Sequence, residues 1–314
     1  MTTGALTTSP SETLAWEAEN RSRASVAAWL AAIMTLAGAL LTSIAFNSMP
    51  KYEDRTVTII DGLRDLAAGQ PLPAGRAVLQ LQFIGDHPLR FIPGPLLSAL
   101  GALLLYFALA YLFRAARARS GALSQGVLIS LATGAVTYAI GTMVIGIMRV
   151  VEGANLAANA TNSDALDALQ GGPMIVGTII QLVGSFILGF ALVMISLNAM
   201  RTGLLPRFIG IIGMLAGATF VLPLDQQGII RAFWIGAIGF LIAGRWPSSV
   251  PAWQTGKAEP WPSAAETQAR KAAAREAAAA GAGATSPPPT DVQLPQQPEQ
   301  QSTQDQRRKK RKRG

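Results

Sequence analysis

Residues 126–152 read GVLISLATGAVTYAIGTMVIGIMRVVE, an apolar run that ends in the charged residues Arg149 and Glu152. About 20 residues at a helical rise of 1.5 Å per residue cross the roughly 30 Å of hydrocarbon in a bilayer. On such a helix Gly134, Tyr138 and Gly141 share one face, and small residues on one face favour close packing against a neighbouring helix. The stretch therefore predicts a membrane-spanning helix inside a bundle.

The composition also favours a membrane protein. Only 14% of the 314 residues are charged and 50% are hydrophobic, whereas about a quarter of a soluble domain is charged. The formal charge of +8 is uneven: residues 245–314 hold 12 Lys/Arg and 6 Asp/Glu, or +6, which leaves 14 − 12 = +2 for residues 1–244. The basic character belongs to the C-terminal tail.

Five further apolar runs flank the opening stretch, so the sequence predicts an all-α, polytopic transmembrane helix bundle of about six spans. The last two runs lie below the usual 17–25 residues, and a re-entrant hairpin is the competing interpretation of them. The five runs are 24–46, 91–113, 174–197, 208–222 and 229–243.

The remaining segments are polar. We expect a cytoplasmic N-terminal segment (1–23), a transmembrane domain (24–244) with exterior loops at 47–90 and 155–172, a Trp/Pro-rich juxtamembrane segment with an Ala-rich helix (245–280), and a disordered basic tail (281–314). Within the loops, Leu79–Phe83 fits a helix better than a strand, and Ser163 is expected to cap a short helix at 164–169.

Catalytic and metal-binding motifs are missing from the sequence. The absence of cysteine excludes disulfides, thiol nucleophiles and thiolate metal sites, and the single histidine, His87, excludes a multi-histidine site within one chain. Serine-hydrolase, P-loop and zinc-protease motifs are absent. We expect no cofactor, no metal and no catalytic residues, and an intramembrane enzyme is only the third hypothesis.

One group of polar residues is expected near the exterior face. Ionisable groups at membrane depth usually face the bundle interior and have partners. The group can be structural, with Arg149 and Glu152 paired to each other or to Asp225 and Arg231, or it can bind a polar ligand. We favour structural pairing; mutually satisfied side chains would support it, and an open polar cavity would support transport. The candidates are Arg149, Glu152, Gln181, Asp225 and Arg231.

The segment after the last span holds two kinds of membrane-binding residue. The indoles of Trp246, Trp253 and Trp261 are expected to lie among lipid headgroups. Near anionic lipid each basic residue gains about 1 kcal/mol; the terminal run could instead contact ribosomal RNA or another acidic partner, or act only in orientation and solubility. The run comprises Arg307, Arg308, Lys309, Lys310, Arg311, Lys312 and Arg313.

Several blocks together resemble a family of uncharacterised integral membrane proteins of actinobacteria that often end in a charged cytoplasmic tail. The resemblance covers most of residues 87–262. More distantly, Arg149–Glu152 and Pro206–Arg207 resemble a broader bacterial membrane family of unknown function. The resemblance implies a multi-span fold in a bacterial plasma membrane, and it implies no activity. The blocks are YLFRA (111–115), LNAMR (197–201), GLLPRFIG (203–210), PAW (251–253) and PWP (260–262).

The leading hypothesis is a non-enzymatic membrane protein whose tail contacts anionic lipid or an acidic partner; the alternative is a small-molecule transporter or receptor with a polar site near the exterior face. Liposome flotation of the isolated 245–314 segment tests the leading one. We expect recovery with acidic liposomes at low salt and its loss at high salt, because screening weakens surface electrostatics. Equal recovery with neutral and acidic lipid at both salt concentrations contradicts the hypothesis.

Charge placement predicts the orientation. Short loops rich in arginine resist translocation, so both termini, Arg114–Arg119 and Arg201–Arg207 should be cytoplasmic. Because the chain lacks cysteine, single cysteines have no background. On intact cells without an outer membrane, an impermeant maleimide should label Ser163→Cys and leave Ser120→Cys unlabelled. The reverse pattern overturns the orientation, and labelling of both breaks the span count.

Overall fold

The structure is a computed structural model that describes residues 9–50, 63–64, 66–69, 75–222, 224–225, 227–247, 250–261, 266, 268–269 and 271–276. The described residues are helical or irregular, with no strand among them. Four helical stretches in this part of the chain are long and apolar enough to cross a membrane: Pro10–Asn47, Pro88–Ser120, Gln125–Asn155 and Gly172–Arg201. The predicted all-α membrane fold is confirmed.

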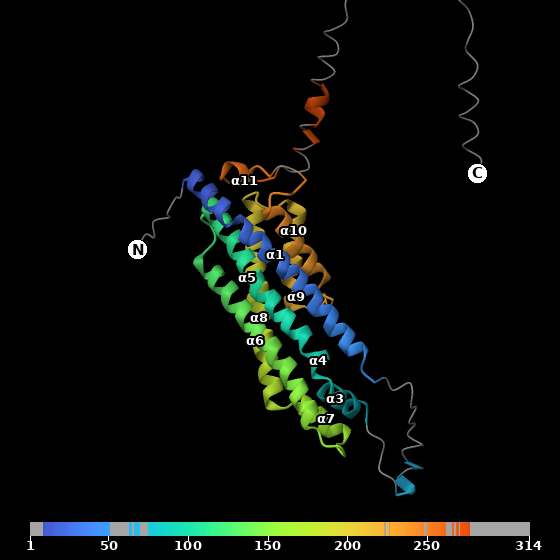
Figure 1. Ribbon diagram of the computed structural model, residues 1–314. Helices are drawn as coiled ribbons and strands as arrows, with labels where there is room; N and C mark the ends of the chain where they lie inside the picture. Colours follow the sequence, from blue (N-terminus) through green and yellow to red (C-terminus); the bar gives the residue numbers. More distant parts are fainter. Residues whose placement is uncertain are drawn as a thin grey trace, which may run out of the picture. The chain divides into compact units, whose positions relative to one another are not determined.

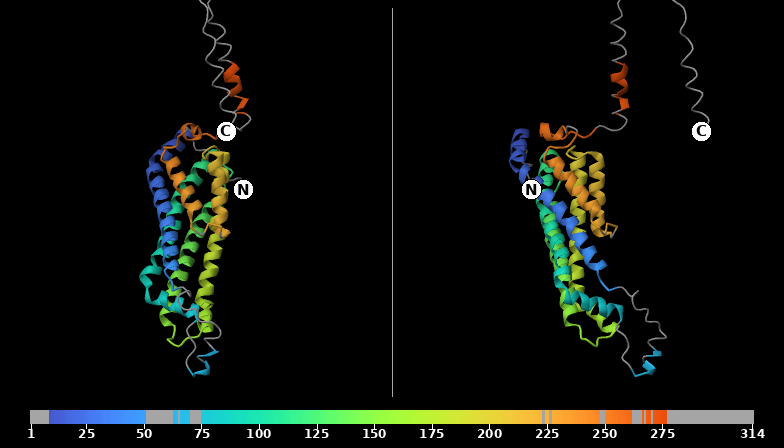
Figure 2. Two further views of the ribbon diagram at one scale, coloured as in Figure 1. Left: turned by 90° about the vertical axis from the view of Figure 1, so that its right-hand side faces the viewer. Right: turned by 45° about the vertical axis from the view of Figure 1, so that its right-hand side comes forward.

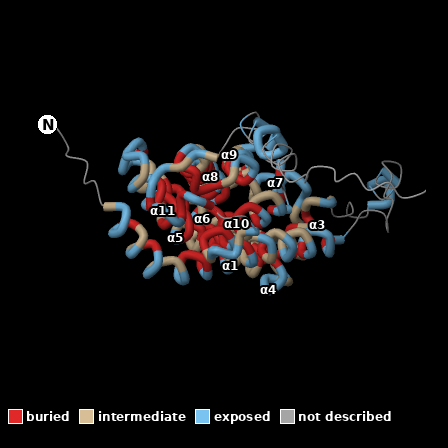
Figure 3. The backbone as a smooth tube through the Cα atoms, turned by 90° about the horizontal axis from the view of Figure 1, so that it is seen from above, coloured by how far each residue is buried: buried red, intermediate tan, exposed pale blue. Residues whose placement is uncertain are grey.

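The helices pack as a ring. α1 (Pro10–Asn47) packs on α5 (Pro93–Ser120), α5 on α6 (Gln125–Asn155), and α6 on α8 (Gly172–Arg201). The shorter α9 (Arg207–Val221) and α10 (Ile229–Ile242) complete the ring, because α9 packs on α8 and α10 packs on α1 (Figure 1). Buried residues lie in the centre and exposed ones on the outside (Figure 3); many exposed residues are large and apolar, such as Ile44 at 63% and Ile129 at 62%. An apolar outer surface of this extent suits contact with lipid.

Glycines set the spacing between α6 and α8. Gly184 lies so close to α6 that an added Cβ would overlap the backbone nitrogen of Tyr138. In the same way Gly141 lies against the backbone of Gln181 on α8. Close approach of two backbones increases dispersion contact where no hydrophobic effect operates between helices. The predicted small-residue face of residues 126–152 is therefore used for helix packing.

One end of the ring, here named the capped end, is covered by short helices. These helices lie next to the C-terminal ends of α1 and α6 (Figure 1). They are α3 (Arg76–Asp86), α4 (Pro88–Phe91) and α7 (Asn162–Leu169). The predicted helix at 79–83 is confirmed, and its buried side chains join those of Met49 and Phe91.

The N-cap of α7 is Thr161, so the prediction of Ser163 as the cap was wrong by two residues. Thr161 exchanges hydrogen bonds with Asp164 in a capping box. The backbone N–H and hydroxyl of Thr161, which donate to this carboxylate, hold the pKa of Asp164 below its usual range.

The opposite end, here named the arginine-rich end, is held by a buried ion pair. The guanidinium of Arg119 on α5 binds the carboxylate of Glu17 on α1, and both side chains are fully buried. Arg119 also donates to the carbonyl of Ala252 at 2.7 Å, which attaches α11 (Ala252–Thr255). α1 begins at Pro10, so residues 10–23 of the expected polar N-terminal segment continue the first apolar helix, and Glu17 is buried among them.

The tryptophans after α10 contact protein. Trp253 is buried, stacks on Tyr111 with ring centroids 5.9 Å apart, and donates its indole N–H to the carbonyl of Leu204. Its predicted place among lipid headgroups is wrong, because the protein itself satisfies both its ring and its N–H. The half-buried Trp261 donates to the carbonyl of Gly203 at 3.1 Å. The anchoring role of Trp246, also half-buried, stays a prediction.

Residues 262–314 form a second unit. Its described residues, 266, 268–269 and 271–276, are helical and agree with the predicted Ala-rich helix. The predictions for 281–314, including the basic run at 307–313, lie outside the described residues.

α9 and α10 are shorter than the other helices of the ring. With 15 and 14 residues they rise about 22 Å and 21 Å, whereas the 30-residue α8 rises about 45 Å. Gly228, at the turn between them, lies beside Thr35 and Ala39 of α1, so the turn falls part-way along the bundle (Figure 2). The hairpin therefore closes the ring at the arginine-rich end only.

Candidate functional site

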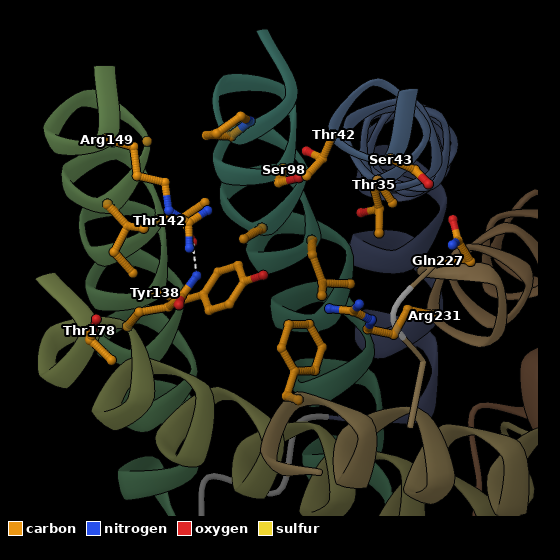
Figure 4. A pocket seen from close by; sticks show the side chains of 18 residues that line it. Thr35, Thr42, Ser43, Ser98, Tyr138, Thr142, Arg149, Thr178, Gln227 and Arg231 are labelled. Carbon is orange, nitrogen blue, oxygen red and sulfur yellow. Dashed lines mark hydrogen bonds between the residues drawn. The ribbon is translucent and has the colours of Figure 1, made fainter. Parts of the chain in front are cut away.

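A cavity of about 680 Å³ lies where the hairpin stops. α1, α5, α6 and α8 form its walls, and residues of the α9–α10 hairpin line its remaining side (Figure 4). Its polar lining consists of six hydroxyl residues, one tyrosine, two amides and two arginines: Thr35, Thr42, Ser43, Ser98, Thr142, Thr178, Tyr138, Gln181, Gln227, Arg149 and Arg231. Such a concentration of polar groups within apolar helices is expensive in lipid and usually marks a ligand or ion path.

Arg231 is paired. Its side-chain Nε lies 3.4 Å from Oδ2 of Asp225, its backbone N–H donates to the same oxygen at 3.1 Å, and its Nη2 donates to the Asp225 carbonyl at 2.9 Å. The guanidinium also lies 5.0 Å from the ring centre of Phe220. Asp225 is buried behind Arg231, so the charge of this arginine is balanced inside the protein.

Arg149 reaches the cavity from the opposite side (Figure 4). Its guanidinium lies 5.5 Å from the ring centre of Phe46. The two ion pairs formed within the described part of the chain are Glu17–Arg119 and Asp225–Arg231, and Arg149 belongs to neither. Of the alternative pairings expected for Arg149, neither the one with Glu152 nor the one with Asp225 is present among the described residues, and Glu152 does not line the cavity.

Gln181 serves both packing and the site. Its amide N–H donates to the hydroxyl of Thr142 at 3.0 Å, which confirms the expected interhelical hydrogen bond between α8 and α6 (Figure 4). The close approach at Gly141 brings the two side chains within reach. This bond leaves the amide oxygen of Gln181 available on the wall of the cavity.

Of the five predicted site residues, the structure brings Arg149, Gln181 and Arg231 to one cavity, holds Asp225 behind Arg231, and leaves Glu152 out. The sequence interpretation missed the hydroxyls of α1 and α5, which include Thr35, Thr42 and Ser98, and also Tyr138, Thr142, Thr178 and Gln227 on the other walls. Thr35 and Thr42 are seven residues apart, a spacing that places them on one helix face. That spacing was the signal that could have found them.

The described residues contain no group of three or more His, Asp or Glu side chains that could hold a metal ion. The chemistry that the lining offers is recognition by hydroxyl, amide and guanidinium groups. The guanidinium fork is suited to carboxylate and phosphate oxygens.

The difference between the two arginines predicts different responses to mutation. Asp225→Asn leaves Arg231 without its carboxylate and should lower the free energy of unfolding by about 3 kcal/mol, as breakage of a largely buried pair does. Arg149→Gln removes a cation that has no ion-pair partner among the described residues and should leave thermal stability unchanged or raised. Both are measured as the unfolding midpoint of the purified protein in detergent. Equal losses in the two variants would show that Arg149 also has a stabilising partner.

Comparison with known proteins shows a family. No curated protein and no solved structure matches the chain significantly. The model of a domain of unknown function, DUF4386, matches residues 56–224. This range covers just over half of the chain and includes the cavity residues on α5, α6 and α8, whereas α1 and α10 lie outside it. The chain therefore belongs to the DUF4386 family.

Proposed function

We propose that this protein is a non-enzymatic receptor or carrier that binds a polar ligand in the cavity at the end of the α9–α10 hairpin. The observation that carries the proposal is the cavity itself: eleven polar side chains line about 680 Å³ between helices whose outer faces are apolar. The described side chains that line it include no carboxylate, histidine or cysteine, and hydroxyl, amide and guanidinium groups support binding of a polar ligand.

The proposal includes a location and an orientation. The resemblance supports an actinobacterial plasma membrane, and the arginines at 114, 117, 119, 201 and 207 support a cytoplasmic arginine-rich end with both termini inside. The capped end would then face the exterior, and the cavity would lie in the outer half of the bilayer. A ligand would reach it from outside the cell or from the outer leaflet.

The basic tail is a second candidate for contact with anionic lipid or ribosomal RNA. Its support is the run of seven basic residues at 307–313. The two functions are compatible, because the tail is expected in the cytoplasm and the cavity toward the exterior.

Cysteine accessibility tests the cavity. Ser98 lines it, whereas Ser196 is 0% exposed in the core and serves as the matched control. A small, charged, impermeant methanethiosulfonate should modify Ser98→Cys from outside at least roughly tenfold faster than Ser196→Cys, since a thiol in apolar surroundings has a raised pKa and little reactive thiolate. Small polar solutes that occupy the cavity should slow the reaction at Ser98→Cys.

Equal, slow modification of the two variants contradicts a water-accessible ligand site. Rapid modification of Ser98→Cys only from the cytoplasmic side would support the cavity and overturn the proposed orientation.

A further inference from the structure

The ring of helices is incomplete beside the cavity. In the half nearer the capped end, the α9–α10 hairpin no longer lies between α1 and α8: Gly228 lies beside Ala39, and α1 continues eight residues further, about 12 Å, to Asn47. Thr42 and Ser43 of α1 and Thr178 of α8 line the same cavity from either side of this gap. No described helix covers the cavity between α1 and α8 beyond the end of the hairpin, and this gap is here named the opening.

The surface around this opening is apolar. On α1, Leu40 and Ile44 are 46% and 63% exposed, and on α8, Ile175 and Ile179 are 50% and 54% exposed. At the turn of the hairpin, Leu224 is 70% exposed. Side chains of this kind are stable next to acyl chains and unfavourable in water. A hydrocarbon chain is therefore stable at this opening, and a polar headgroup meets its partners inside the cavity.

The charge of the cavity is positive. Among the described residues its lining contains two charged side chains, Arg149 and Arg231, and Asp225 neutralises one of them, so 2 − 1 leaves a net charge of +1. An unpaired arginine within the membrane costs about 3 kcal/mol on insertion scales. One negative charge on a ligand would offset this cost, and hydroxyls such as Thr142 are available as further donors.

From the apolar opening and the single unbalanced cation we infer that the ligand is a membrane amphiphile with a monoanionic phosphate or carboxylate headgroup. The headgroup lies between Arg149 and Arg231, and the hydrocarbon chain extends through the opening between α1 and α8 into the leaflet at the capped end. This inference rests on the proposed function and supplies its ligand class.

Binding of a labelled lipid to the purified full-length protein in detergent tests the inference. The probe is radiolabelled phosphatidylglycerol, with phosphatidylcholine of the same chains as the uncharged comparison and glycerophosphoglycerol as the same phosphodiester without chains. The assay is run at about 0.5 M salt, where the Debye length lies between roughly 3 and 8 Å and exposed basic residues are screened. We expect saturable binding of phosphatidylglycerol with an affinity at least about tenfold higher than that of either comparison compound. A tenfold difference corresponds to the contribution of about one hydrogen bond to a charged group.

Two variants with the same change in net charge locate the site. Arg149→Gln should weaken phosphatidylglycerol binding at least about tenfold, whereas Arg201→Gln, at the exposed arginine-rich end, should not. Thr178→Trp places a bulky ring at the exposed edge of the opening and should also reduce binding without unfolding the protein.

The outcomes separate the inference from the proposed function. Equal affinity for phosphatidylglycerol and phosphatidylcholine, or equal losses in Arg149→Gln and Arg201→Gln, overturns the anionic headgroup. If glycerophosphoglycerol binds as tightly as phosphatidylglycerol, the amphiphile is wrong and the cavity stands as a site for soluble anions. If none of the three binds and Ser98→Cys is also unreactive, the proposed function itself fails.

Discussion

The length of the α9–α10 hairpin is the constraint on which the rest of the structure depends. Two helices of 15 and 14 residues cannot cover neighbours of 30 residues or more. They complete the ring of helices at one end and leave α1 and α8 without a helix between them at the other. The space for the cavity and the gap between α1 and α8 follow from this difference in length.

Several polar groups of the cavity have hydrogen-bond partners within the protein. Asp225 lies in the turn itself and accepts hydrogen bonds from the backbone and side chain of Arg231, so one cation of the cavity is neutralised locally. Gln181 and Thr142 satisfy one another across α6 and α8. Among the described residues, the contact recorded for the guanidinium of Arg149 is with the ring of Phe46. Arg149 is therefore the cavity residue best placed to bind a negatively charged ligand.

The arginine-rich end provides a fixed base for this arrangement. The Glu17–Arg119 pair joins α1 to α5, and the bond from Arg119 to the Ala252 carbonyl holds the chain that follows α10. Arg119 thus joins three segments at this end. At the capped end, in contrast, the helices are held together by a small, separate hydrophobic cluster that includes Met49, Leu81 and Ala165. Any movement that admits a ligand is thus expected around the opening rather than at the arginine-rich end.

The sequence by itself determined the helices: apolar length and helical period identified the four long helices and the two short ones, and the small residues of 126–152 indicated close packing. These features depend on neighbours along the chain, which a sequence displays directly. Only the tertiary structure decided which polar residues meet. The position of the hairpin turn along the bundle and the packing of α6 bring Arg149 and Arg231 to one cavity, whereas Glu152 does not line it. It also decided that Trp253 is buried and that Glu17 is paired, because both partners, Tyr111 and Arg119, lie on a helix about a hundred residues or more away in the sequence. Contacts of that kind follow from how helices pack, and one sequence read by its periodicity does not contain them.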